Sequence, residues 1–146
     1  MKDLLATIDF SEVTPLVVET AASLGKAFGA KVWLVHVAAP DPDFVGFKVG
    51  PSYVREQRAE TLRQEHQDIQ AIAADLNARG IDAEARLVQG PTTDTILEMA
   101  TKVEAGLIVM GSHGKSALFR AFVGSVSEQV LRDSKVPVMI IPTPRS

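Results

Sequence analysis

The sequence contains no cysteine. This absence excludes a disulfide framework, a thiol nucleophile and a metal site built from thiolates. The three histidines are scattered and lack the spacing of metal ligands, so we expect no metal site held by protein side chains alone. A cysteine-free chain is compatible with a reducing compartment, and we expect a cytoplasmic protein.

Long basic runs and long apolar runs are also missing. The net charge is −3, so the chain offers no basic surface for nucleic acid phosphates. No apolar run approaches the roughly 20 residues that span a bilayer. The N-terminal segment meets Asp9 and Glu12 too early to be a signal peptide. We therefore expect neither a nucleic acid partner nor a membrane partner.

The remaining composition is that of a folded protein. Hydrophobic residues make up 46% of the 146 residues and charged residues 23%, which differs from a disordered chain. The length suits one hydrophobic core, and no linker or internal repeat interrupts it. We predict a single domain over residues 1–146.

Short apolar runs alternate with longer stretches of helical periodicity. Strands are expected at residues 4–8, 32–37, 83–87, 107–110 and 136–141, with a helix between each pair. This alternation predicts an α/β fold, an open five-stranded parallel sheet with helices on both faces. The third strand alternates apolar and charged residues, as edge strands do, which predicts the order 3-2-1-4-5 of a Rossmann-like sheet.

Helical periodicity predicts which side chains face the sheet. In the first helix, Thr14 is expected to cap the start and Gly29 to end it. Its apolar face is expected to contain Val17, Ala21, Leu24 and Phe28. The corresponding face of the second helix is expected to contain Leu62, His66, Ile69, Ala73 and Leu76. We also expect Trp33 in the core and a structural role for His36.

The predicted strand order locates a ligand site. The winding of the sheet reverses between the first and fourth strands, and ligands bind outside the carboxyl ends of strands at such a reversal. Asp9 follows the first strand, and the segment from Gly111 follows the fourth. We expect a ligand between them.

The segment GSHGKS, residues 111–116, has only part of a P-loop. The full spacing G-x-x-x-x-G-K-[ST] needs a glycine at position 109, where Val109 stands. What is present is Gly111-Ser112-His113-Gly114, followed after nine residues by Gly124-Ser125-Val126-Ser127. Glycines let backbone N–H groups approach a ligand, and a helix N-terminus favours phosphate. These two segments predict a phosphate site, with the hydroxyls of Ser125 and Ser127 as further donors.

The pattern G-x-x-G, nine residues, G-[ST] resembles the nucleotide-binding motif of the universal stress protein family. Asp9-Phe10-Ser11-Glu12 is similar to that family's opening segment, His36-Val37 to its second segment and Val136-Pro137-Val138 to its closing strand. The resemblance implies that Asp9 contacts the ribose or adenine side of ATP and that the Val37 backbone lies at the adenine edge. The candidate nucleotide-binding residues are Asp9, Val37, Met110, Gly111, His113, Gly114, Gly124, Ser125, Val126 and Ser127.

The resemblance also implies a regulatory role in the stress response, with ATP as ligand and Mg²⁺ carried by the triphosphate. The apolar segment 136–141 would lie at a sheet edge that needs cover, and the resemblance likewise implies a homodimer through it. No base, nucleophile or arginine-finger arrangement is recognisable, so we assign no catalytic residue.

Two alternatives remain open at this point. One is a slow ATPase or autophosphorylating enzyme of the same fold, and the other is a protein-interaction dimer with a vestigial nucleotide site. An oxidoreductase would need G-x-G-x-x-G after the first strand, where residues 9–14 read DFSEVT. A phosphorelay receiver would need an aspartate after the third strand, where Gln89-Gly90 stands.

Overall fold

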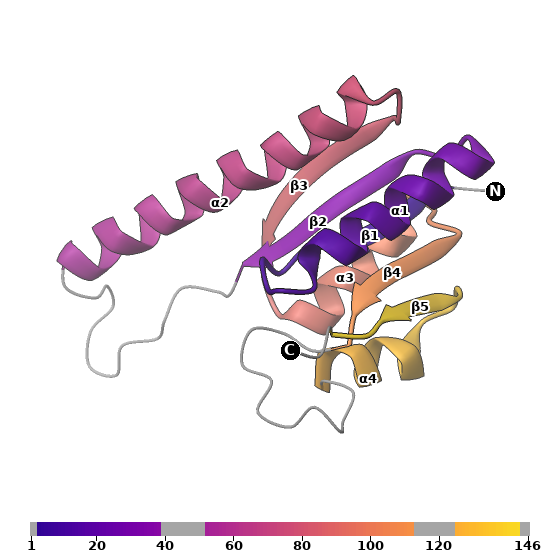
Figure 1. Ribbon diagram of the computed structural model, residues 1–146. Coiled ribbons are helices and arrows are strands. Elements are labelled where there is room, and N and C mark those ends of the chain that lie inside the picture. Colours follow the sequence, from indigo (N-terminus) through magenta and orange to yellow (C-terminus); the bar gives the residue numbers. More distant parts are fainter. Residues whose placement is uncertain (1–2, 39–51, 113–124, 144–146) are drawn as a thin grey trace.

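The structure is a computed structural model that describes residues 3–38, 52–112 and 125–143 (Figure 1). The elements follow one another as β1 (Leu4–Thr7), α1 (Thr14–Phe28), β2 (Val32–Ala38), α2 (Ser52–Ala78), β3 (Ala83–Gln89), α3 (Thr92–Lys102), β4 (Leu107–Gly111), α4 (Ser125–Asp133) and β5 (Val138–Ile141). The loop between residues 40 and 52, which the sequence left without a role, lies almost wholly outside the described residues.

The sheet confirms the expected architecture. Its five strands are parallel and follow the order β3-β2-β1-β4-β5. Helices α1 and α2 cover one face, and α3 and α4 cover the other (Figure 1). The connections through α1 and α2 run in one direction across the sheet and place these helices on one face. The connections through α3 and α4 run in the opposite direction and place their helices on the other face, as right-handed crossovers require.

Alternation along β1 divides the core into two layers. Leu4 and Ala6 belong to the layer under α1 and α2, whereas Leu5 belongs to the layer under α3 and α4. All three are completely buried, because β1 is the central strand and both of its faces are covered. The carboxyl end of β1 therefore has a fixed place in the molecule.

Helix α1 follows the sequence prediction at its end and departs from it at its start. Gly29 has the left-handed backbone (φ 62°) that favours glycine at a helix C-terminus. The N-cap position, however, is occupied by Val13, which makes no side-chain capping bond, and Thr14 is already helical. Phe28 is 50% exposed rather than packed, because Gly25 is the last buried residue of the helix.

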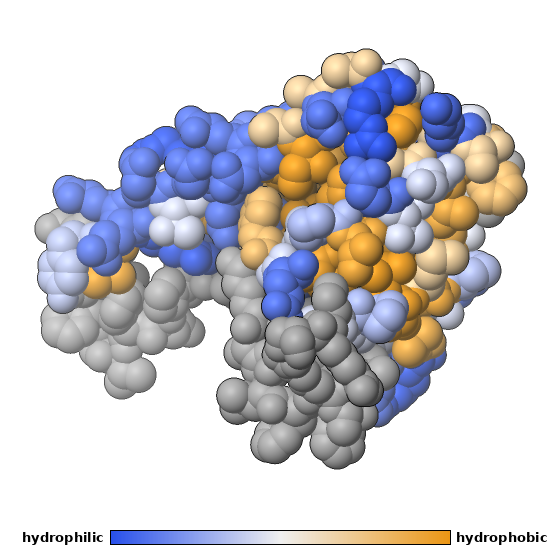
Figure 2. All heavy atoms as spheres, viewed as in Figure 1, coloured by the Kyte–Doolittle hydropathy of each residue, from blue (hydrophilic) through white to orange (hydrophobic). Residues whose placement is uncertain are grey.

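Helix α2 packs on the sheet with its C-terminal half only. Ile69, Ala73 and Leu76 are buried, whereas the N-terminal part extends beyond the carboxyl ends of β2 and β3 (Figure 1) and has a mostly hydrophilic surface (Figure 2). The prediction that His66 packs in the core is wrong, since this side chain is exposed. The inward position is Glu65, four residues before Ile69 and therefore on the same helical face.

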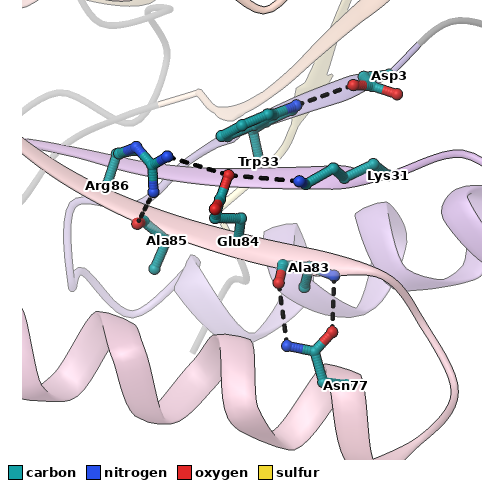
Figure 3. A network of polar contacts seen from close by, with 8 residues as sticks. All are labelled: Asp3, Lys31, Trp33, Asn77, Ala83, Glu84, Ala85 and Arg86. Atoms are coloured by element: carbon teal, nitrogen blue, oxygen red, sulfur yellow. Dashed lines mark hydrogen bonds and ion pairs between the residues drawn. The ribbon is translucent and has the colours of Figure 1, made fainter.

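The C-terminal end of α2 is fixed by polar contacts as well. The Asn77 amide donates to the Ala83 carbonyl (3.0 Å) and accepts from its N–H (2.9 Å), which joins the helix to β3 (Figure 3). Arg79 donates from both terminal nitrogens to the Glu19 carboxylate of α1, at 2.9 Å each. This pairing with the guanidinium lowers the pKa of Glu19 below its ordinary value.

Trp33 lies outside the apolar core, contrary to the sequence prediction. Its indole N–H donates to Asp3 (3.0 Å), and the Lys31 ammonium lies 4.3 Å from the ring centroid (Figure 3). Glu84 of β3 contacts both Lys31 (3.4 Å) and Arg86 (3.1 Å). Because β3 is an edge strand, charged side chains cover this part of the sheet, whereas a helix would cover a central strand.

In the part of the chain that the structure describes, no helix has both the length and the apolar character needed to cross a membrane.

Gly25 allows α1 to approach β2 closely. A Cβ at this position would lie 2.8 Å from Cγ2 of Val32 and 3.1 Å from the Ala30 carbonyl oxygen. We predict that Gly25→Ala lowers the free energy of unfolding by about 1–3 kcal/mol, because the helix or the strand must move. Urea denaturation measures the change. Ala27→Ser adds one heavy atom at an exposed position of α1 and is expected to cost no more than about 0.5 kcal/mol; equal effects of the two substitutions would contradict the packing explanation.

Candidate functional site

The candidate site lies at the carboxyl ends of β1 and β4, where the winding of the sheet reverses. Ala6 of β1 pairs with Val109 of β4. Asp9 follows three residues after this pair on one strand and Gly111 two residues after it on the other. The sheet register therefore brings these two predicted site residues to the same edge.

The Asp9 side chain organises the turn between β1 and α1. Its Oδ1 accepts hydrogen bonds from the Ser11 N–H (2.9 Å), the Ser11 hydroxyl (2.6 Å) and the Thr14 hydroxyl (3.4 Å). This is the arrangement of an Asx turn, in which one carboxylate oxygen replaces a backbone acceptor. Oδ2 receives no hydrogen bond from any residue within 3–38, 52–112 or 125–143. One oxygen of Asp9 thus holds the turn and the other can accept from a ligand.

Phe10, directly after Asp9, has a backbone conformation that side chains seldom adopt. Its φ is 60°, in the left-handed region. The ring packs edge-on against the His36 ring, with 4.8 Å between centroids. Such conformations persist only where surrounding contacts enforce them, and they are frequent at functional sites.

His36 lies at the centre of this edge, in the strand next to β1. The ring is only 6% exposed, and its Nδ1 lies 2.7 Å from the carbonyl oxygen of Ile8. Its Nε2 lies 3.1 Å from Oε2 of Glu65 on α2, within ion-pair distance but without the alignment of a hydrogen bond. Sequence reasoning expected a structural His36 but missed its partner. The spacing 62, 65, 69 on α2 was the available signal for Glu65.

Ser127 joins β4 to α4. Its hydroxyl donates to the Gly111 carbonyl at 2.8 Å and lies 3.2 Å from the Ser112 carbonyl, and the side chain is 3% exposed. With its proton given to these carbonyls, the hydroxyl is not available as a phosphate donor in this arrangement. Its backbone N–H, like those of Ser125 and Val126, belongs to the first turn of α4 and has no acceptor within the helix.

Ser112 attaches the end of β4 to the end of β5 and to Thr143 beyond it. Its N–H donates to the Ile141 carbonyl (2.9 Å), and its hydroxyl oxygen accepts from the Thr143 N–H (3.2 Å). The side chains of Ser112 and Ser127 thus hold the end of β4 in place, in addition to the backbone hydrogen bonds of the sheet.

The other predicted residues divide into two groups. The Met110 side chain is buried in the core layer under α3 and α4, so this residue can meet a ligand only through its backbone, and the side chains of Val37 and Val126 are partly buried against the same layer. Ser125 is exposed at the start of α4. His113, Gly114 and Gly124 lie outside the described residues.

A groove of about 660 Å³ borders this edge on the α2 side. It is lined by Phe10 and by polar side chains of α2, which are Gln57, Glu60, Thr61, Gln64, Glu65 and Asp68. Within the described ranges, no three histidine or acidic side chains are grouped as metal ligands would be.

The Ser127 contact predicts a stability effect. Ser127→Ala leaves buried backbone carbonyls at the end of β4 without their donor, and we expect a loss of about 1–3 kcal/mol in the free energy of unfolding. Thermal and urea denaturation measure it. Ser23→Ala makes the same chemical change at an exposed position of α1 and should stay within about 0.5 kcal/mol of wild type. A Ser127→Ala protein as stable as this control would contradict the assigned contact.

Comparison with known proteins gives the family. The model of the Universal stress protein family matches residues 1–142. A universal stress protein of Methanocaldococcus jannaschii is 30% identical over 145 residues, which cover 99% of this chain and 84% of that protein.

Solved structures agree. The structure of the hypothetical protein MJ0577, also from Methanocaldococcus jannaschii, has a TM-score of 0.83 at 25% identity and covers 99% of this chain and 98% of its own. A universal stress protein in complex with cAMP has a TM-score of 0.66 at 26% identity, with 98% of both chains covered. The sheet order, the residues at its reversal point and these matches together mean that this chain belongs to the universal stress protein family.

Proposed function

We propose that the protein is an ATP-binding regulatory protein of the stress response. It acts as a cytoplasmic homodimer, and residues 1–146 form one universal stress protein domain. The observation that carries this proposal is the placement of Asp9 and the α4 N-terminus at the reversal point of the sheet. The cAMP complex of a related structure supports an adenine nucleotide as the ligand class.

The ribose and the phosphates each have a suitable partner in the described residues. Oδ2 of Asp9 is an acceptor for a ribose hydroxyl, since Oδ1 is already occupied by the turn. The first N–H groups of α4, from Ser125 to Ser127, suit phosphate because they lack helical acceptors and lie at the positive end of the helix dipole. The backbones of Val37, Met110 and Gly111 are proposed to complete the site, together with His113, Gly114 and Gly124.

The residues present favour binding over turnover. Mg²⁺ would arrive with the triphosphate and keep most of its waters, which demands few protein ligands. The Ser127 hydroxyl is engaged in holding backbone, and the second oxygen of Asp9 is assigned here to the ribose, so neither side chain is given a catalytic role. A slow ATPase or autophosphorylating activity is the alternative to a purely regulatory site, and a vestigial site is the other.

Asp9→Asn provides a direct test of nucleotide binding. Asn keeps an oxygen for the turn but replaces the second carboxylate oxygen with an NH₂ group, which cannot accept from ribose. We expect ATP to bind at least about tenfold more weakly, measured by isothermal titration calorimetry. Asp82→Asn, at an exposed position before β3, should leave the affinity unchanged.

Nucleotide released from purified protein by denaturation gives a second readout. Recovered ATP or ADP supports the proposal. If no nucleotide is recovered and wild type fails to bind ATP at millimolar concentration, the ATP assignment is wrong and the vestigial-site alternative gains. Steady turnover of ATP above background would favour the enzyme.

The edge strand β5 supports the proposed dimer. Met139 is 36% exposed, and its neighbours Val138 and Ile140 are only half-buried. A second copy of β5 would cover this apolar edge and supply partners for its free backbone groups. The family resemblance implies the same arrangement.

Met139→Lys is predicted to break the dimer, because two copies would place ammonium groups together in an apolar contact. Analytical ultracentrifugation should give about twice the 15.7 kDa chain mass for wild type and the chain mass for the variant. Leu16→Lys places the same charge at an exposed site on α1 and should stay dimeric. A monomeric wild type would reject the assembly.

A further inference from the structure

Three elements meet at the His36 ring, and we propose that His36 is a positioning residue that couples the docking of α2 to nucleotide binding at Asp9. We name this set the His36 bridge: the Ile8 carbonyl, the His36 ring and the Glu65 carboxylate. Its effect on nucleotide affinity rests on the proposed function, whereas its mechanical link between α2 and β1 does not.

The contact with Ile8 fixes which ring nitrogen carries a proton. A carbonyl oxygen can only accept, so at 2.7 Å the Nδ1 atom must be the donor. The N–H of Ile8 still belongs to the ladder and donates to the Val35 carbonyl at 2.8 Å. Ile8 is therefore held to β2 on both its donor and its acceptor side, immediately before Asp9. The His36 side chain thus sets where the chain leaves the sheet.

The same ring supports the next residue. The Phe10 ring packs edge-on against His36, and Phe10 has the left-handed backbone conformation that needs such support. Asp9 lies between Ile8 and Phe10, so both of its chain neighbours contact one side chain. A displacement of the His36 ring would move the Asp9 carboxylate relative to Gly111 and α4.

The opposite side of the ring faces α2. Glu65 Oε2 lies 3.1 Å from Nε2, and both side chains are mostly buried, so the pair is attractive when a proton lies on one of these two atoms. The C-terminal half of α2 is held by buried apolar residues, by Asn77 and by Arg79. Glu65 extends this attachment one helical turn beyond Ile69, toward the part of α2 that projects past the sheet (Figure 1).

These contacts have a thermodynamic consequence. A ligand that holds Asp9 in place stabilises the His36 ring orientation, and that orientation favours docked α2. By linkage, a docked α2 must favour the ligand to the same extent. The groove between Phe10 and α2 is the part of the surface whose shape this coupling would change.

Two substitutions at His36 test the role of the hydrogen bond that its ring donates to Ile8. In His36→Asn, the amide nitrogen can take the place of Nδ1 and still donate to Ile8, but it cannot reach Glu65. His36→Leu keeps an apolar side chain and removes the donor. We expect ATP affinity to fall about tenfold in His36→Leu and by a smaller factor in His36→Asn, which keeps the donor to Ile8 but loses the ring against Phe10 and the contact with Glu65. Equal affinity in His36→Leu and wild type would overturn the positioning role, as would equal losses in both variants.

Glu65→Ala tests the link to α2. We expect amide hydrogen exchange in residues 56–68 to become at least about tenfold faster, and bound ATP to slow that exchange less than in wild type. Glu56→Ala removes an exposed acid of α2 that does not line the groove and should leave both measurements unchanged. Unchanged exchange in Glu65→Ala would overturn the coupling.

One spectroscopic measurement does not depend on nucleotide. The ¹⁵N shifts of His36 should report a protonated Nδ1 in wild type, and exchange at residues 9–12 should be faster in His36→Leu than in His36→Asn. If wild type binds no ATP but these results hold, the ATP assignment fails and the His36 bridge remains. A wild-type ring with an unprotonated Nδ1 would reject the bridge itself. If His36→Leu does not fold, the Glu65→Ala and ¹⁵N measurements carry the decision.

Discussion

The pairing of β1 with β2 on one side and with β4 on the other fixes the carboxyl ends of these strands, where Asp9, Val37 and Gly111 lie. Both faces of β1 are buried, so this short strand can neither tilt nor slide without opening two core layers. Asp9 is attached to its carboxyl end, and Gly111 ends the neighbouring strand. The precision of the site thus comes from apolar packing that never touches a ligand.

Where the backbone hydrogen bonds of the sheet end, buried polar side chains provide the hydrogen-bond partners. At β1 the acceptor of Ile8 is satisfied by His36, and at β4 the acceptor of Gly111 is satisfied by Ser127. In both cases the side chain comes from a different element than the carbonyl it serves. A buried carbonyl needs a partner, and a strand that must release its chain toward a ligand cannot obtain that partner from the backbone of its neighbour strand. This explains why the edge that carries the candidate site also carries these side chains.

Much of the fold could be predicted from the sequence because its determinants are local. Runs such as residues 4–8 and 107–110 are too apolar for an exposed strand, the alternation in 83–87 indicates an edge, and Gly29 suits a helix end. The same local pattern brought Asp9 and Gly111 to one edge. Their contacts with a ligand remain predictions, as do those of the residues outside the described ranges.

The departures have a common physical cause, which is that burial depends on the partner as well as on periodicity. Phe28 has the right spacing but lies past the last covered turn, and His66 is one position away from the face that Glu65 occupies. Trp33 has the composition of a core residue, but its strand lies next to an edge strand with charged side chains. The local sequence does not show which neighbours pack against these three residues, and those neighbours determine how far each is buried. The sequence likewise predicted a phosphate contact for the Ser127 hydroxyl. Its observed acceptor, the Gly111 carbonyl, lies 16 positions earlier in the chain and is not part of any local pattern.

The position of Trp33 has a practical consequence for solution work. It is the only tryptophan in the chain and lies at the amino end of β2, whereas the candidate site lies at the carboxyl ends of the strands. Five residue steps along the strand, about 16 Å, lead from Trp33 to Ala38. Its indole N–H donates to Asp3, directly before β1, and this hydrogen bond breaks when the N-terminal strand leaves the sheet. The protein thus contains an intrinsic fluorophore that follows the integrity of the sheet and stands apart from whatever occupies its opposite edge.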